Sequence, residues 1–506
     1  MLRRVSTTLA FAAVTALSLV TQAAFASKAN DTLVAAFQAQ LPSLDRYHAP
    51  GREGFLLGLL AYDALIYRDP KDLQMKPLLA TAWRQVSPLI WEFDLRKGVK
   101  FHDGVEMTAE DVAFSLQYAA NPDNRVFNRM TGGWIKSVDI VDPYKIRVTS
   151  AEVTPLALEY IVQLPIIPAK YRQKVGLEGF GAAPIGTGPY KIAKRAGNEI
   201  TFVRNDAYFD GGAKNKPKIK TLVYRTIPDV NTQLAELIGG GVEWAYYIPN
   251  DQAARLEKMP MVKVTNADTF RIGFLTLDAG GLSDPNSPLK NVKVRQAIAY
   301  ALNRDAMAKT LVGGSSKTIA AACTPSQFGC TQDVPSYTYD VSKAKALMAE
   351  AGYKDGFDIE VYGYRSRPVA EAIIGNLNAI GVRANLRWMQ YSAVIQQRRD
   401  HKTPIVIDDY GSAGVNDAGG ILPFFFAESP DDQSRDPVVT EAVRKAGSIG
   451  DPAQRKALYA TALKRIADQA YWVPLFTMPV NYVFAKDLSI PIPGDENVEF
   501  WRAEWK

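Results

Sequence analysis

The stretch between residues 91 and 116 has the clearest hydrophobic pattern in the chain. Apolar residues alternate with charged ones from Trp91 to Leu95, which is the two-residue period of a half-buried strand. Gly98 and Gly104 indicate turns, because glycine adopts the positive φ angles of many turns at little cost. The pattern therefore predicts one strand, and a short second strand from Val99 to Phe101 between the two turns.

A capped helix is predicted directly after these turns. Thr108 is a residue type that accepts hydrogen bonds from the amides of a first helical turn. Val112, Leu116 and Ala119 then repeat at helical spacing, which predicts an amphipathic helix with one buried face.

Two later regions alternate strand and helix patterns, which is typical of α/β proteins with parallel strands. The first has a strand at 222–226 and a helix at 232–238. The second has strands at 357–362 and 382–388 joined by a helix at 369–380, a complete βαβ unit. The fold class predicted from these patterns is α/β.

Charged residues follow two of the predicted strands. The loop Gly363 to Pro368 contains Arg365 and Arg367 after the strand at 357–362, and Asp408 to Gly411 follows an apolar strand at 404–407. Open α/β sheets bind ligands at the carboxyl ends of their strands. If both strands share a sheet, arginine and aspartate flank one crevice, where they suit a zwitterion. The alternative is that these charges pair with each other or lie in solvent.

The N-terminus has the features of an export signal. Met1 to Ala26 contains two arginines, an apolar run and small residues at its end. Removing it from 506 residues leaves 480, too many for one hydrophobic core, so two or three domains are expected. No cysteine stands directly after the apolar run, where a lipoprotein carries its lipid anchor, so we expect a soluble periplasmic protein without such an anchor. The remaining net charge is about +4, and the charged residues are spread along the chain without a block of like charge. This pattern does not suggest nucleic-acid binding.

The sequence contains little reactive chemistry. Its only cysteines, Cys323 and Cys330, lie close together in a chain expected in an oxidising compartment, which favours a local disulfide over two free thiols. The three histidines have no zinc-ligand spacing, and no G-x-S-x-G elbow occurs. We therefore expect no catalytic residues, no metal, no cofactor and no enzymatic activity.

Several motifs together resemble those of the family-5 extracellular solute-binding proteins, the peptide- and nickel-binding receptors of ABC importers. The motifs are LRKGVKFHDG with T-A-E-D-V from Leu95 to Val112, PIGTGPYK from Pro184 to Lys191, VKVRQAIAYALNR from Val292 to Arg304, and AKALMAEAGY from Ala344 to Tyr353. The resemblance implies a two-lobed periplasmic-binding-protein fold with a third, smaller insert domain. It implies lobe I at 27–56, 184–267 and 478–506, the insert at 57–183, and lobe II at 268–477.

The resemblance also implies the function. A monomeric periplasmic receptor would capture a di- or oligopeptide, or a peptide-like zwitterion, by hinge closure and deliver it to an inner-membrane ABC permease. Alternatives are a receptor for a nickel chelate or a sugar-type solute and, outside the receptor class, a secreted hydrolase or a periplasmic chaperone.

Carried over from the peptide-binding members, the ligand-gripping arginine falls on Arg367 and the aspartate on Asp409. Arg365 lies in the same loop. Aromatic residues are expected to cover the apolar part of the ligand, and the candidates are Tyr364, Trp388, Tyr410, Trp134, Trp244, Tyr246 and Tyr247.

Overall fold

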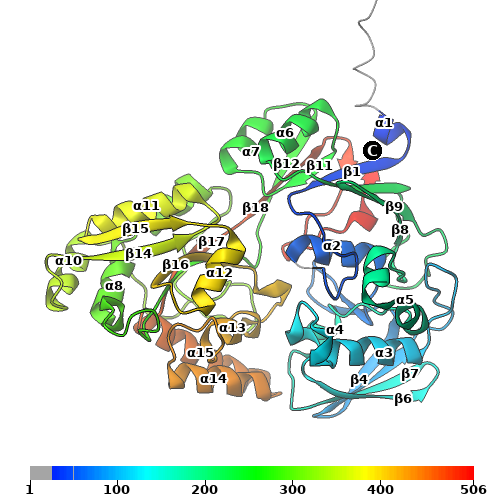
Figure 1. Ribbon diagram of the computed structural model, residues 1–506, viewed down its shortest axis with the longest axis horizontal. Helices are drawn as coiled ribbons and strands as arrows, with labels where there is room; N and C mark the ends of the chain where they lie inside the picture. The colour runs from blue at the N-terminus through cyan, green and yellow to red at the C-terminus, as the bar shows by residue number, and fades with distance from the viewer. Residues whose placement is uncertain (1–25, 50) are drawn as a thin grey trace, which may run out of the picture.

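The computed structural model describes residues 26–49 and 51–506, which form two lobes lying side by side (Figure 1). The predicted export signal lies outside the described residues except for its last residue, Ala26. Within the described part of the chain, no helix has both the length and the apolar character needed to cross a bilayer.

The first lobe is built around a seven-stranded sheet. Its strands, in spatial order, are β12 (Val262–Ala267), β18 (Val480–Ala485), β11 (Trp244–Tyr246), β1 (Thr32–Phe37), β10 (Thr221–Thr226), β9 (Glu199–Arg204) and β8 (Tyr190–Ala196). Only β1 has parallel neighbours, β10 and β11, and the other pairs are antiparallel. The expected parallel arrangement is confirmed for β10 and β11, which both run parallel to β1. It does not extend to the rest of the sheet, because β8 and β9 form an antiparallel hairpin and β18 returns from the far end of the chain.

Both faces of β1 are buried, which explains its continuous run of apolar residues. Leu33, Ala35 and Phe37 pack with α2 (Gly51–Ala61) in one hydrophobic cluster. Val34 and Ala36 pack on the opposite face, against α6 (Val230–Gly239) and α7 (Asn250–Leu256).

A four-stranded antiparallel sheet completes the first lobe and shares the hydrophobic cluster of α2. Its order is β4 (Ala80–Ser87), β5 (Ile90–Leu95), β7 (Lys145–Ser150) and β6 (Ile135–Asp142), and it packs with α3 (Ala109–Ala120). The predicted strand and capped helix are confirmed as β5 and α3, where the N–H of Thr108 donates to Asp111. The predicted strand Val99 to Phe101 is wrong. That segment folds back on residues 105–107 instead of joining a sheet.

The second lobe contains a five-stranded sheet with the order β15 (Val382–Trp388), β14 (Phe357–Gly363), β16 (Ile405–Tyr410), β13 (Ile272–Leu277) and β17 (Trp472–Thr477). The predicted βαβ unit is confirmed, since α11 (Arg367–Asn378) joins the parallel strands β14 and β15. β16 is parallel to β14, whereas β13 is antiparallel to both of its neighbours.

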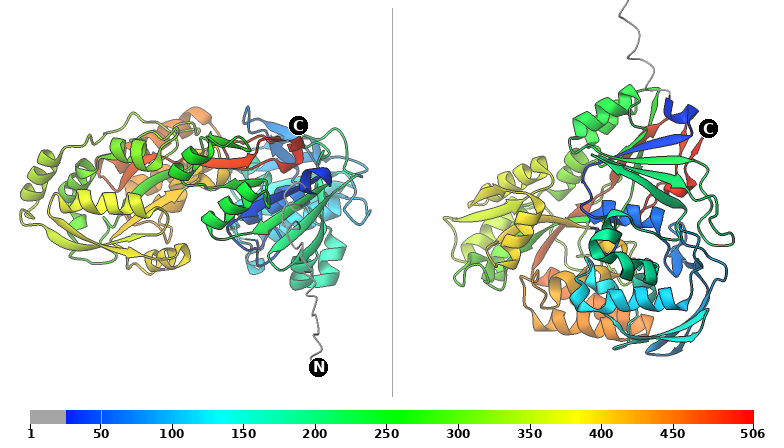
Figure 2. Two further views of the ribbon diagram at one scale, coloured as in Figure 1. Left: turned by 90° about the horizontal axis from the view of Figure 1, so that it is seen from above. Right: turned by 45° about the vertical axis from the view of Figure 1, so that its right-hand side comes forward.

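Helices cover both faces of the five-stranded sheet (Figure 2). One cluster contains α8 (Val292–Ala301), α10 (Val341–Glu350) and α11, and the other contains α13 (Leu422–Phe426), α14 (Pro437–Ser448) and α15 (Pro452–Asp468). Besides short 3-10 and π turns, the remaining helices and strands are α1 (Ala26–Ala29), β2 (Ile66–Arg68), β3 (Met75–Pro77), α4 (Ala157–Ile161), α5 (Ala169–Ala182), α9 (Arg304–Met307), α12 (Tyr391–Arg399), β19 (Leu488–Ser489) and β20 (Glu504–Trp505).

Two crossing segments connect the lobes, residues 268–271 after β12 and residues 478–479 before β18. They lie against each other. The N–H of Met478 donates to the carbonyl of Arg271 at 2.9 Å, and the Thr269 hydroxyl donates to the carbonyl of Met478 at 2.8 Å. The junction between the lobes is thus a hydrogen-bonded pair of short chains.

Candidate functional site

Asp409, near the end of β16, is the centre of a charge cluster at the edge of the five-stranded sheet. Its carboxylate is buried and pairs with two guanidinium groups, those of Arg271 and Arg365. Arg365 follows β14 and Arg271 precedes β13. Three neighbouring strands therefore place one acid and two bases at a single point.

Sheet topology explains this convergence. β14 and β16 are parallel neighbours, so their carboxyl ends lie at the same edge, as the sequence predicts. β13 runs antiparallel to β16, and the register pairs Ile272 with Tyr410. The start of β13 therefore lies at that edge too, which brings Arg271 to Asp409.

Arg365 is the least enclosed member of the cluster, with 42% of its side chain exposed. The carboxylate of Asp409 raises the pKa of Arg365, so the guanidinium stays charged. Its central carbon lies 5.6 Å from the ring centre of Tyr364 and 5.9 Å from that of Tyr247, which belongs to the first lobe. Among the described residues, no acceptor takes a hydrogen bond from its two Nη groups. These donors are available to a ligand.

Glu496 carries the charge cluster into the first lobe. Its carboxylate lies 3.4 Å from Nε of Arg271 and 3.5 Å from Nη2 of Arg52, and it accepts a hydrogen bond from the Tyr247 hydroxyl. Burial opposes ionisation of Glu496, but the guanidinium groups of Arg271 and Arg52 outweigh it and lower its pKa to about 2. The cluster therefore crosses between the lobes through Arg271.

A second group of charged side chains is fully buried in the second lobe, next to the cluster. Arg398 of α12 pairs with Asp408 at 2.5 Å and with Asp431 at 2.8 Å. Asp408 also accepts a hydrogen bond from the Tyr364 hydroxyl. Tyr364 is thereby held beside Arg365 by a network within the second lobe.

A small pocket lies between the lobes near this cluster. The first lobe contributes Phe55, Tyr67, Arg68 and Trp501, and the second lobe contributes residues 413–414. Nη2 of Arg68 donates to the carbonyl of Gly414, and the same guanidinium pairs with Glu159 and Asp495. Both lobes thus line the pocket.

Residues with positive φ gather at the interface of the lobes. Non-glycine residues rarely adopt this conformation, which costs about 1–3 kcal/mol each unless the surroundings impose it. Tyr247, Ser412, Ala413 and Glu496 have φ values of 56°, 51°, 51° and 62°, and Gly414 follows with 72°. The segment after β16 is therefore held in an unusual backbone conformation where it meets the first lobe.

Some predicted ligand residues lie away from this cluster. Arg367 begins α11 and points to solvent, where its Nε lies 2.8 Å from Glu371. Trp388 ends β15 beside Gly363. Tyr410, by contrast, directly follows Asp409 in the chain, and its ring stacks on that of Phe424 with 5.2 Å between the ring centres. Of the two arginines in the loop after β14, it is therefore Arg365, and not Arg367, that pairs with Asp409.

The aromatic candidates of the first lobe are mostly core residues. Trp134 is buried and its Nε1 donates to the carbonyl of Thr131. Trp244 and Tyr246 are buried and stack on each other, and the Tyr246 hydroxyl donates to Glu53. Tyr247, by contrast, reaches Arg365 and Glu496.

Sequence reasoning missed Arg271, Glu496, Arg52 and Arg68. Arg271 had a detectable signal, since it interrupts an otherwise apolar strand pattern from Phe270 to Phe274. The other three do not follow a strand of the five-stranded sheet, and only the packing of segments distant in the sequence brings them to the interface.

Within the described residues, no cluster of three or more histidine, cysteine or acidic side chains has the arrangement of a metal site.

Comparison with known proteins gives a consistent result. The profile of the bacterial extracellular solute-binding proteins, family 5, matches residues 74–433. The glutathione-binding protein GsiB of Salmonella choleraesuis is 27% identical over 489 residues, covering 92% of this chain and 93% of GsiB.

Solved structures share the fold over nearly the whole chain. The periplasmic binding protein DppA of Helicobacter pylori, in complex with the peptide STSA, superimposes with a TM-score of 0.80 at 23% identity, covering 94% of this chain and 98% of DppA. The protein AgaA of A. tumefaciens R10, in complex with agropinic acid, gives a TM-score of 0.78 at 23% identity, covering 94% and 99%.

Proposed function

The chain belongs to the bacterial extracellular solute-binding proteins of family 5, and on this basis we propose that it captures a di- or oligopeptide, or a peptide-like zwitterion, between its lobes. It would then deliver this solute to an ABC permease. The observation that carries the proposal is the placement of Arg365 and Asp409 at one sheet edge, with Tyr247 of the opposite lobe over Arg365.

Arg365 suits the carboxylate of such a ligand. Its Nε pairs with Asp409, which fixes the plane of the guanidinium, and its two Nη groups form a fork that matches a carboxylate. Closure of the lobes would remove water from this contact and strengthen it.

Asp409 suits the ammonium group. One of its oxygens pairs with Arg271 and the other with Arg365. Each carboxylate oxygen has a second lone pair, so an ammonium could bind there without displacing either guanidinium.

Titration calorimetry with a panel of short peptides tests this assignment. Each peptide is compared with its N-acetylated form, which lacks the ammonium, and its C-amidated form, which lacks the carboxylate. We expect both modifications to weaken binding. Equal affinity for free and modified peptides, or no binding by any member of the panel, would refute the zwitterion assignment.

We further propose that the protein acts as a periplasmic monomer without a lipid anchor and releases its solute unchanged. Native mass spectrometry of the purified protein tests the monomeric state, the absence of a lipid and the intact solute, and cell fractionation tests the periplasmic location. A monomer that carries an intact small solute supports them, whereas cleaved peptide products would favour the hydrolase alternative.

We propose lobe I at 27–56, 184–267 and 478–506, the insert domain at 57–183, and lobe II at 268–477, because each range then contains one of the three large sheets.

A further inference from the structure

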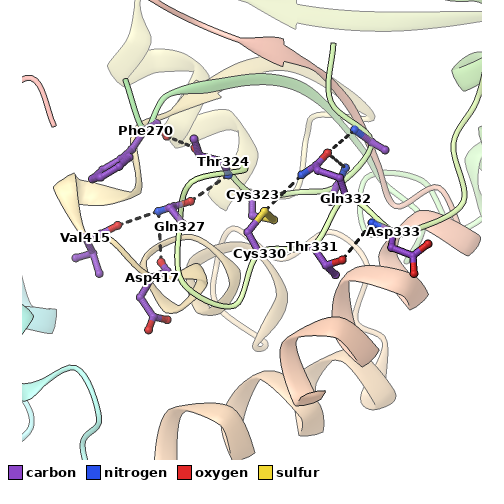
Figure 3. The surroundings of a disulfide bond; sticks show 12 residues. Phe270, Cys323, Thr324, Gln327, Cys330, Thr331, Gln332, Asp333, Val415 and Asp417 are labelled. Atoms are coloured by element: carbon purple, nitrogen blue, oxygen red, sulfur yellow. Dashed lines mark hydrogen bonds between the residues drawn. A yellow bond between two sulfur atoms is a disulfide. The ribbon is translucent and has the colours of Figure 1, made fainter. Parts of the chain in front are cut away.

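The disulfide between Cys323 and Cys330 closes a loop that lies against the cleft wall of the second lobe (Figure 3). The loop contacts this wall and also the crossing segment that precedes β13. The Thr324 hydroxyl donates to the carbonyl of Phe270 at 2.6 Å, directly before Arg271. Nε2 of Gln327 donates to the carbonyl of Val415 at 2.8 Å.

The wall itself is the segment 412–418, which follows the strand that carries Asp409. It contains the run of positive φ angles from Ser412 to Gly414. It also meets the first lobe directly, since the carbonyl of Gly414 accepts a hydrogen bond from Arg68 and that of Ala413 accepts one from Gln163. A change in this segment would alter the surface that the first lobe closes upon.

Gln327 is placed to hold the wall. Its side chain is buried, and its Oε1 accepts a hydrogen bond from the N–H of Thr324 at 3.0 Å. Its Nε2 donates to the carbonyl of Val415 and, at 3.4 Å, to that of Asp417. One amide therefore links the closed loop to two residues of the wall.

A backbone contact runs beside the side-chain contact. The N–H of Ala418 donates to the carbonyl of Phe328 at 2.9 Å, and Phe328 pairs with Asp417 as an isolated parallel bridge. The loop is also tightly seated, because a Cβ atom at Gly329 would lie 2.4 Å from the ring of Tyr459. The loop and the wall are thus joined by backbone as well as side-chain hydrogen bonds.

We propose that the disulfide-closed loop 323–330 is a brace that fixes the position of the cleft wall 412–418, with Gln327 as its positioning residue. The disulfide limits the conformations of the loop, so Gln327 remains in reach of Val415 and Asp417. The inference rests on the proposed function only in treating the wall as part of a ligand cleft.

Hydrogen–deuterium exchange of the ligand-free full mature chain tests the brace. In Gln327→Ala, we expect the amides of Gly414, Val415 and Ala418 to exchange about tenfold faster, because the wall loses two hydrogen bonds. Gln327→Glu keeps an acceptor for Thr324 but has no donor for the wall, so it should behave like Gln327→Ala.

Gln332→Ala is the matched control. Gln332 flanks the same disulfide, and its Oε1 accepts hydrogen bonds from the N–H groups of Ala320 and Ala321, but it has no hydrogen bond to the wall. We expect exchange of residues 412–418 in this variant to equal that of the wild type. If Gln327→Ala and Gln332→Ala change the wall equally, Gln327 does not position it.

Reduction of the wild type provides an independent arm. Dithiothreitol converts the disulfide to two thiols and is itself oxidised to its cyclic disulfide. Faster exchange of residues 412–418 after reduction is expected, and unchanged exchange would overturn the brace. Because these measurements need no ligand, their outcome is separate from that of the peptide titrations.

Discussion

Nε of Arg271 lies 3.4 Å from Oε1 of Glu496, across the junction of the two lobes. Arg271 belongs to one of the two crossing segments and also pairs with Asp409. One of the two bases that contact the proposed ligand-binding aspartate is therefore also held by the first lobe. This relationship couples the charge of the site to the geometry of the junction.

We predict that Glu496→Gln lowers the free energy of unfolding by about 1–3 kcal/mol at pH 7, because it leaves Arg271 and Arg52 without their shared carboxylate. The folded-state pKa of Glu496, about 2, lies below its ordinary value of 4.5. This contribution is thus present above pH 4.5 and is lost as the pH falls towards 2.

Denaturant unfolding at several pH values measures this difference. The gap between wild type and Glu496→Gln should narrow below pH 4.5. Glu504→Gln, which alters a more exposed ion pair with Lys218, should change stability by less than about 0.5 kcal/mol. A gap that does not vary with pH would contradict the prediction.

Arg365→Ala should weaken binding of a free peptide by about 10- to 100-fold, because a bidentate charge-assisted contact is lost. Arg367→Ala is the control, since among the described residues Arg367 pairs only with Glu371, at the solvent-exposed start of α11. Calorimetry decides between the two arginines. A loss of affinity in Arg367→Ala alone would restore Arg367 as the ligand residue.

Arg398→Met should destabilise the protein by about 3–5 kcal/mol, because it leaves the buried carboxylates of Asp408 and Asp431 without their shared partner. Its neighbour Arg399 also contacts Asp431, but its side chain is 47% exposed. Arg399→Met should therefore cost less than about 1 kcal/mol. Thermal and denaturant unfolding compare the two variants directly.

The raised pKa of Glu499 predicts that its contribution to stability depends on pH in the opposite direction to that of Glu496. Burial raises its pKa to about 7, with an opposing but smaller effect of Arg502. Between pH 4.5 and 7 the folded state binds more protons than the unfolded state, so this group destabilises the fold as the pH rises.

Glu499→Gln should therefore be more stable than the wild type by about 1–3 kcal/mol at pH 8, and the two should converge below pH 4.5. The amide can still accept the hydrogen bond from the Tyr67 hydroxyl. Glu441→Gln, at an exposed position of α14, should show no such trend. Lower stability of Glu499→Gln at pH 8 would show that the carboxylate is needed there.

Gly186→Ala should destabilise the protein by about 1–3 kcal/mol, because its Cβ atom would lie 2.1 Å from the carbonyl oxygen of Ala61. Gly375, within α11, has open space at the same position. Gly375→Ala should stabilise by about 0.5–1 kcal/mol. Melting temperatures that shift in the same direction for both variants would contradict this argument.

The sequence predicts local structure well where one pattern dominates. α8, α11, α15 and the strands of the βαβ unit follow from helical or alternating spacing, because each buries one defined face. The segment Val99 to Phe101 fails because two closely spaced turns let it bond to residues 105–107, which a periodicity argument does not detect.

The site is predictable only in part. Arg365 and Asp409 follow from the ends of β14 and β16, since the βαβ unit fixes the direction of the strands. Choosing between Arg365 and Arg367 requires knowing where α11 begins, and Arg367 is its first residue. Glu496 is about 90 residues from Asp409 in the chain, so no local pattern connects them.

The position of β18 has a consequence for the order of folding. β18 lies inside the seven-stranded sheet, between β12 and β11, yet it is made of residues 480–485 of a 506-residue chain. A chain synthesised from its N-terminus cannot complete this sheet until almost all of it is available. The second lobe, by contrast, takes all its strands from one continuous range, β13 to β17. During synthesis or refolding we therefore expect the second lobe to form first, and we expect formation of the first lobe to be the slow, rate-limiting step.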